Sequence, residues 1–148
     1  MPIRYEHSVV VHTTPARAFA AIDDLPLTAK WLPPCVSLEK VGSGPNAPGD
    51  KLRYVYRQGS RQGAMDGQIV ARTPGERLNC KYFDAMFDVS VDLRVAPAPE
   101  GAQTLHAIEI TTKTVMAKLF SPLIRLGVGK QTRHAAANLK KLLESTAA

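Results

Sequence analysis

The sequence predicts an α+β fold in which a curved antiparallel sheet of seven strands is combined with two short helices and one long C-terminal helix. Three observations support this prediction. One strand-like segment precedes two short helical segments, six alternating segments follow, and the chain ends in an apolar repeat of helical spacing. A chain of 148 residues suits a single domain, so we expect 1–148 to form one unit. An antiparallel sheet with one wet face must cover the other, and only the terminal helix is long enough to do so. We therefore expect the two to enclose a cavity.

The chain begins with a predicted strand and two short helices. Residues 3–12 are rich in β-branched and aromatic side chains, which is typical of a strand. Thr14 and Pro15 indicate a helix start, with the threonine as N-cap and the proline in the first helical position. This helix should end near residues 23–24. A second short helix is predicted over 25–32, where two consecutive prolines end it.

Six further strands are predicted in the middle of the chain. They are residues 36–41, 51–57, 64–72, 77–83, 86–95 and 103–113. The clearest has an apolar face made of Phe87, Val89, Val91, Leu93 and Val95. Asp88 and Asp92 lie on its opposite, wet face, so they cannot flank a cleft as the paired carboxylates of a glycoside hydrolase do.

The Gly-rich stretch GSGPNAPG at 42–49 is disfavoured as a phosphate loop, because a strand and not a helix N-terminus follows it.

The last part of the chain is predicted to be one amphipathic helix, because apolar positions recur every three or four residues. These positions are Phe120, Ile124, Val128, Thr132, Ala135, Leu139 and Leu142. Pro122, Gly127 and Gly129 weaken the first half of the repeat. We therefore expect a bend or a break of the helix near them.

The composition is that of an ordinary globular protein. Hydrophobic residues at 45% and charged residues at 22% exclude disorder. No run approaches the roughly 20 apolar residues of a membrane-spanning helix, and the first residues lack the apolar core of a secretory signal. Cys35 and Cys80 form no CxxC or His–Cys cluster, so we expect them to be small apolar residues and expect no metal or other cofactor. These features favour a cytoplasmic protein.

The basic charge is concentrated towards the C-terminus. The net charge is +6, and residues 101–148 hold seven basic and two acidic side chains, a net of +5. No acidic residue lies between Glu109 and Glu144. Such a stretch is typical of a solvated helix face, or of a surface that makes weak contact with an anionic membrane. Nucleic acid is disfavoured, because the basic residues lack interleaved aromatics. The sequence leaves both a monomer and a homodimer open.

Three sets of residues are candidates for a binding site. Tyr54 and Tyr56 share one strand face, and a tyrosine offers a ring and one hydroxyl to a mostly apolar ligand; the alternative is simple packing in a half-buried sheet. Cys80 and Tyr82 form a similar pair. His106 is in phase with Ile108 and Ile110, which places an imidazole on an apolar face. It could act as a general acid or base, bind a ligand carbonyl, or be a core histidine satisfied by the backbone. The full predicted ligand-binding set is Tyr54, Tyr56, Cys80, Tyr82, Phe87, Val89, His106, Ile108 and Ile124.

Three stretches carry a resemblance to a known superfamily: VHTTPARAFAAIDDLPLTAKWLPP at 11–34, GDKLRYVYRQG at 49–59 and NLKKLLE at 138–144. With Asp24, Trp31 and Pro33 in matching places, the chain resembles the START-like (SRPBCC) helix-grip superfamily, and within it the polyketide cyclase/dehydrase-type branch of small bacterial proteins. The resemblance implies the Bet v 1-like fold and a deep apolar cavity for lipids, sterols, polyketides or plant-hormone-like molecules. Some members cyclise or aromatise polyketides, but no catalytic residue carries over to this chain.

Three functions follow as hypotheses. The first is binding of a small hydrophobic or lipid-like molecule without chemistry. The alternative is a cyclase or aromatase-like lyase acting on a carbonyl substrate, with His106 as the candidate catalytic residue and the tyrosines holding carbonyl oxygens. The third is docking on an anionic membrane through the basic helix and the apolar segment LFSPLIRL.

Overall fold

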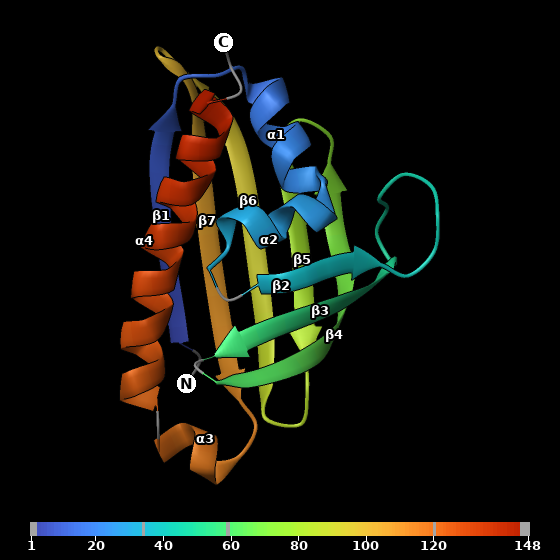
Figure 1. Ribbon diagram of the computed structural model, residues 1–148, viewed down its shortest axis with the longest axis vertical. Coiled ribbons are helices and arrows are strands. Elements are labelled where there is room, and N and C mark those ends of the chain that lie inside the picture. The colour runs from blue at the N-terminus through green and yellow to red at the C-terminus, as the bar shows by residue number, and fades with distance from the viewer. Residues whose placement is uncertain (1–2, 34, 59, 120, 146–148) are drawn as a thin grey trace.

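The computed structural model describes residues 3–33, 35–58, 60–119 and 121–145, and it contains the seven predicted strands in one antiparallel sheet (Figure 1). In chain order the elements are β1 (Ile3–Val11), α1 (Pro15–Asp23), a short 3₁₀ turn η1 (Leu25–Leu27), α2 (Thr28–Trp31), β2 (Cys35–Lys40), β3 (Lys51–Gln58), β4 (Arg61–Thr73), β5 (Arg77–Phe83), β6 (Phe87–Ala98), β7 (Gly101–Thr112), α3 (Val115–Leu119) and α4 (Ser121–Ser145). The α+β prediction is confirmed.

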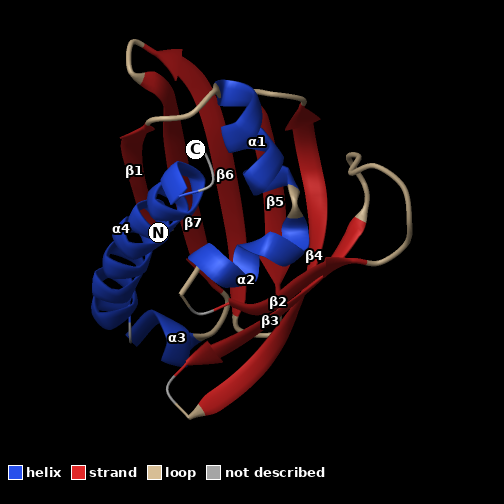
Figure 2. Cartoon of the chain, turned by 45° about the horizontal axis from the view of Figure 1, so that its top comes forward, coloured by secondary structure: helices blue, strands red, loops and turns tan. Residues whose placement is uncertain are grey.

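The strand order is β1-β7-β6-β5-β4-β3-β2, so every neighbouring pair except β1 and β7 is joined by a hairpin connection. All the helices lie on the same side of the curved sheet (Figure 2). α4 packs along β1, while α1 contacts β6 and α2 contacts β2. In this arrangement α4 and the strongly bent strands β3 and β4 lie on opposite sides of the concave face of the sheet (Figure 1).

The start of α1 is formed as the sequence predicts. The Thr14 side chain accepts a hydrogen bond from the backbone N–H of Arg17 at 3.2 Å, and Pro15 occupies the first turn. α1 is then fixed to the sheet by Asp23, whose carboxylate receives two bonds from the guanidinium of Arg72 on β4, at 2.8 and 3.0 Å. Asn46 of the β2–β3 loop donates to the same carboxylate at 2.9 Å. This three-way contact holds α1 and the loop in place.

The C-terminal helices differ from the prediction. α4 runs without interruption from Ser121 to Ser145, so the prediction of a break near its glycines is wrong, whereas the alternative of a bend stays a prediction. Pro122 lies in the first turn, where its missing N–H costs no helical hydrogen bond. Gly129 faces the ring of Tyr5, and a Cβ there would lie 3.3 Å from Cε2 of that ring, so the glycine permits close packing on β1. α3 was not expected at all, and Phe120, the first member of the predicted repeat, lies outside the described residues.

The core lies between the sheet and the helices, in one large and one small cluster of buried residues. The predicted α4 repeat is confirmed from its third member on, since Val128, Thr132, Ala135 and Leu139 are buried and Leu142 packs half-buried against the core. Within the described ranges, no helix combines the length and the apolar character needed to cross a bilayer.

Candidate functional site

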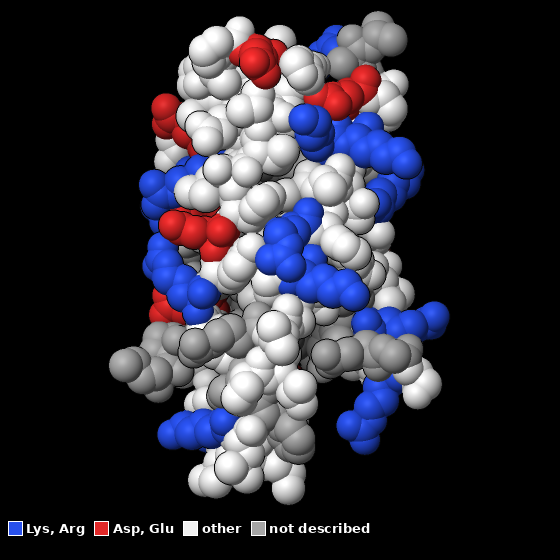
Figure 3. All heavy atoms as spheres, turned by 90° about the vertical axis from the view of Figure 1, so that its left-hand side faces the viewer, with Lys and Arg blue, Asp and Glu red and all other residues white. Residues whose placement is uncertain are grey.

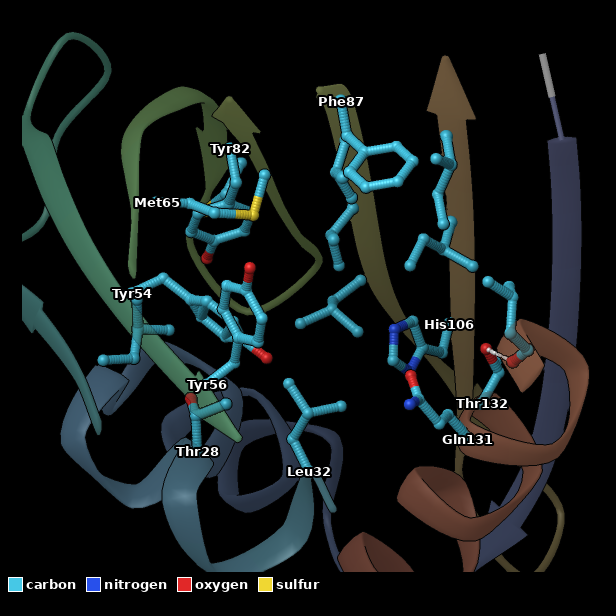
Figure 4. A pocket seen from close by; sticks show the side chains of 18 of the residues that line it. Thr28, Leu32, Tyr54, Tyr56, Met65, Tyr82, Phe87, His106, Gln131 and Thr132 are labelled. Atoms are coloured by element: carbon cyan, nitrogen blue, oxygen red, sulfur yellow. Dashed lines mark hydrogen bonds between the residues drawn. The ribbon is translucent and has the colours of Figure 1, made fainter. Parts of the chain in front are cut away.

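A cavity of about 370 Å³ lies between the concave face of the sheet, α2 and the first half of α4 (Figure 4). All nine residues of the predicted ligand-binding set line it: Tyr54, Tyr56, Cys80, Tyr82, Phe87, Val89, His106, Ile108 and Ile124. Most of the remaining wall is aliphatic. Shared strand phase brought together the eight predicted residues that lie on strands, and Ile124 joins them from α4. Their binding of a ligand stays a prediction.

One wall of the cavity is a cluster of three tyrosines from β3 and β5. The rings of Tyr54 and Tyr56 are nearly parallel, with centroids 5.8 Å apart. The ring centroids of Tyr54 and Tyr82 are 5.4 Å apart. Burial raises the pKa of Tyr54 and that of Tyr82 well above the ordinary tyrosine value. Both phenols are therefore protonated at neutral pH and can donate a hydrogen bond as well as accept one.

Two glycines of β4 make room for this cluster. A Cβ at Gly63 would lie 2.6 Å from the hydroxyl oxygen of Tyr56, and a Cβ at Gly67 would lie 2.6 Å from Cδ1 of Tyr82. Our sequence reasoning missed both glycines. The signal for them was present, because glycine inside a strand often marks close approach of another group.

The opposite wall is centred on His106, which is 7% exposed. Burial, and to a smaller extent the proximity of His7, lowers the pKa of His106 to about 4. His7 is its register partner on β1. The ring of Trp31 is nearly perpendicular to the imidazole, with ring centroids 6.2 Å apart. Among the described residues, no group forms a hydrogen bond with the imidazole. The alternative that His106 is a core histidine hydrogen-bonded to the backbone is therefore wrong.

α4 supplies two polar residues that sequence reasoning missed. Gln131 and Thr132 both line the cavity, and the amide of Gln131 points toward the imidazole of His106 (Figure 4). The hydroxyl of Thr132 is already engaged, since it donates to the carbonyl oxygen of Val128 at 2.7 Å. Thr28 of α2 lies near the tyrosine wall (Figure 4). The cavity thus has two polar regions, one at the tyrosines and one at His106 and Gln131.

The cavity wall is almost free of charge. Asp84 is the one acidic or basic side chain among the described lining residues. It is half-buried and caps the β5–β6 turn by accepting from the backbone N–H groups of Met86 and Phe87, both at 2.8 Å. The Cys80 thiol is also neutral, because burial raises its pKa to about 12. No cluster of three or more His, Cys, Asp and Glu side chains that could hold a metal ion occurs in the described parts of the chain.

The two aspartates of β6 lie away from the cavity. Asp92 is paired with Arg77 and Arg94, each at 2.8 Å, and Asp88 with Lys113 at 3.1 Å. Burial acts to raise the pKa of Asp92, but the hydrogen bonds from the two arginines outweigh it and lower the pKa below its ordinary value. Both carboxylates serve ion pairs outside the cavity.

Comparison with known proteins agrees with this architecture. A sequence model of the family described as polyketide cyclase/dehydrase and lipid transport matches residues 2–144. The crystal structure of TTHA0849 from Thermus thermophilus superposes with a TM-score of 0.80 at 14% identity, over 100% of both chains. The Zhui aromatase/cyclase from Streptomyces sp. R1128 gives 0.80 at 12% identity, covering 97% of this chain and 94% of that one. Ara h 8.0201 gives 0.71 at 17% identity over 99% and 100%. No curated protein matches the sequence. These structural likenesses establish the fold.

Proposed function

We propose that this chain, which belongs to the polyketide cyclase/dehydrase and lipid transport family, binds a neutral and mostly apolar small molecule that carries one or two oxygen atoms. The observation that carries the proposal is the cavity of about 370 Å³, whose described lining holds a single charged side chain. A concave apolar pocket with a few converging polar groups is the usual form of a small-molecule site.

We expect a neutral ligand because the cavity wall carries almost no charge. No lysine or arginine is among the described lining residues, and the imidazole of His106 is neutral at pH 7 because its pKa is about 4. A carboxylate or phosphate buried in this cavity would lose its hydration without gaining a partner of opposite charge, at a cost of several kcal/mol. A neutral ligand avoids that cost.

The two polar regions of the cavity are the reason why we expect the ligand to carry one or two oxygen atoms. The imidazole of His106 has no hydrogen-bond partner among the described residues, and the Tyr54 phenol is protonated. A carbonyl or hydroxyl of the ligand would supply a partner to either region. Such a bond contributes about 1 kcal/mol net, so it orients the ligand while apolar burial provides most of the affinity.

Three naphthalenes of nearly the same shape test both statements by isothermal titration calorimetry. They are 2-acetonaphthone, its oxygen-free isostere 2-isopropenylnaphthalene, and the anion 2-naphthoate. We expect 2-acetonaphthone to bind most tightly and the anion to bind about ten-fold more weakly or worse. His106→Leu should remove the preference for the acetyl group over the isopropenyl group, and His134→Leu, on the exposed side of α4, is the matched control. Tighter binding of the carboxylate would overturn the proposal.

A second candidate function is cyclisation or dehydration of a carbonyl substrate. It is favoured by one observation, that a buried imidazole and tyrosine hydroxyls face the same cavity, and by the family description. A pKa of about 4 makes His106 a weak base at pH 7, which suits hydrogen bonding to a carbonyl better than proton abstraction. The test is product analysis after incubation with a poly-β-keto thioester. Turnover that His106→Gln abolishes would support it, whereas unchanged product formation by that variant would exclude His106 from the chemistry.

A further inference from the structure

The most unusual surface of the molecule is a group of exposed apolar side chains at the end where β7 leads into α3 and α4. Its members are Val115, Met116 and Leu119 on α3 and Leu123 and Leu126 on α4, and we call this group the end patch. Their exposed fractions run from 67% to 76%. Scattered exposed leucines are ordinary, but five such residues gathered on two helices in contact form an apolar surface that water solvates poorly.

The end patch adjoins the cavity. Leu123 belongs to the patch and also lines the cavity, together with Ile124 and Gly127 of the same helix turns. On the other side, Lys113 ties the β5–β6 turn to the start of α3, since its backbone N–H donates to the carbonyl oxygen of Met86 at 2.8 Å. Met86 itself is 43% exposed. The apolar wall of the cavity and the end patch are therefore joined at Leu123.

The charged residues of α3 and of the first half of α4 are all basic. Lys118 lies between Met116 and Leu119 of the patch on α3, and Lys130 lies one turn beyond Leu126 on the same face of α4. Both lysines are exposed, and neither forms an ion pair with a described residue. No acidic residue occurs anywhere between Glu109 and Glu144. In Figure 3 this end is white with blue side chains beside it, and the red side chains lie above it.

We propose that the end patch docks on an anionic lipid bilayer. Its apolar side chains enter the boundary between headgroups and acyl chains, which amphipathic helices penetrate by about 5–10 Å. Lys118 and Lys130 then reach the phosphates along their extended stems. Docked in this way, the protein presents Leu123 and the adjoining cavity wall to the membrane, so an apolar ligand can pass between bilayer and cavity with little exposure to water.

A bilayer fits this surface better than a second copy of the chain does. A two-fold dimer would bring each patch against its own image, which would place the lysines of one protomer beside those of the other. An anionic bilayer instead attracts each lysine, and this attraction weakens as salt screens it. The proposal stands independently of which ligand the cavity holds.

Vesicle co-sedimentation tests the docking surface. The probes are vesicles of phosphatidylcholine alone, and of phosphatidylcholine with one-third phosphatidylglycerol, at about 0.05 M and about 0.5 M salt. We expect binding to the anionic vesicles at low salt, and a clear loss with neutral lipid or at high salt. Met116→Ser/Leu119→Ser should weaken partitioning about ten-fold or more, and Lys118→Ala about five-fold. Neither variant alters a cavity-lining residue, so both should still bind 2-acetonaphthone as the unchanged chain does.

Matched controls are available on other faces. Val41→Ser/Val70→Ser removes two exposed apolar side chains remote from α3, and Lys81→Ala removes an exposed charge from β5. Both controls should sediment with anionic vesicles like the unchanged chain. The proposal is overturned if the unchanged chain stays in the supernatant at low salt, or if the patch variants and the controls behave alike. It is also overturned if sedimentation equilibrium finds a dimer that Met116→Ser/Leu119→Ser dissociates.

Discussion

Gly67 on β4 lies directly against the ring of Tyr82, its register partner on β5, so that a Cβ at Gly67 would come within 2.6 Å of Cδ1 of the tyrosine. The same Cβ would lie 3.0 Å from the carbonyl oxygen of Lys81. Tyr82 is buried and its ring forms part of the cavity wall. A glycine that looks like a weak point of β4 therefore sets the shape of the site.

The first prediction compares the two glycines of β4. Gly67→Ala should lower the free energy of unfolding by about 1–3 kcal/mol, because the buried Tyr82 ring and the β5 backbone cannot easily move away. Gly63→Ala should cost less than about 1 kcal/mol, because it meets only the far end of the half-buried Tyr56 side chain, which can rotate. Urea unfolding measures both. Equal losses for the two variants would contradict this account of the packing.

The second prediction concerns the contact between Asp23 and Arg72. Burial acts to raise the pKa of Asp23, but the hydrogen bonds from Arg72 and Asn46 outweigh it and hold the pKa below its ordinary value of 3.8. The stability that this carboxylate contributes is therefore present above about pH 4 and is lost as the pH falls through the lower, folded-state pKa. Asp23→Asn should cost about 1–3 kcal/mol at pH 7 and should flatten the acid side of the stability curve.

The neighbouring Asp24 provides the control for this prediction. It is exposed and makes no side-chain capping bond, so Asp24→Asn should leave the unfolding midpoint in urea almost unchanged at pH 7. Equal effects of the two substitutions would show that the Asp23 contact does not hold α1 to the sheet.

The third prediction concerns the pH dependence that His106 brings. Its pKa is lowered from 6.5 to about 4, so between these values the unfolded chain binds a proton that the folded chain does not. Stability from this residue is complete above about pH 6.5 and falls by up to about 3 kcal/mol as the pH drops towards 4. His106→Gln should remove this slope and the exposed His134→Gln should leave it. A ring proton of His106 that titrates near pH 6.5 by NMR would refute the assignment.

The fold was predictable from the sequence because several of its strands, β6 above all, alternate with a period of two. In β6 the alternation of Phe87 and Val89 with Asp88 indicated both the strand and its covered face, and the structure confirms both. α3 was missed because five residues make little more than one turn. Its apolar side chains, Val115 and Leu119 among them, also face solvent, so they add no buried stripe to the pattern.

The candidate site was only partly predictable. Tyr54 and His106 could be found because each shares a face with apolar neighbours on its own strand. Gln131 could not, because its place beside the cavity depends on how α4 lies across the sheet, a long-range relationship that leaves no local pattern. The spacing of Gly63 and Gly67 on β4 could have been noticed, but its meaning depends on tyrosines of two other strands.

The central claim is that a neutral apolar molecule occupies the cavity between the sheet and α4. The most direct test is methyl NMR of the protein titrated with 2-acetonaphthone. The account predicts saturable shifts and ligand contacts at the methyl groups of Val91, Ile108 and Ile110, all of which line the cavity, with the exposed Val36 and Val70 unchanged. Shifts confined to the exposed methyl groups, or no saturable shift at any concentration, would contradict it.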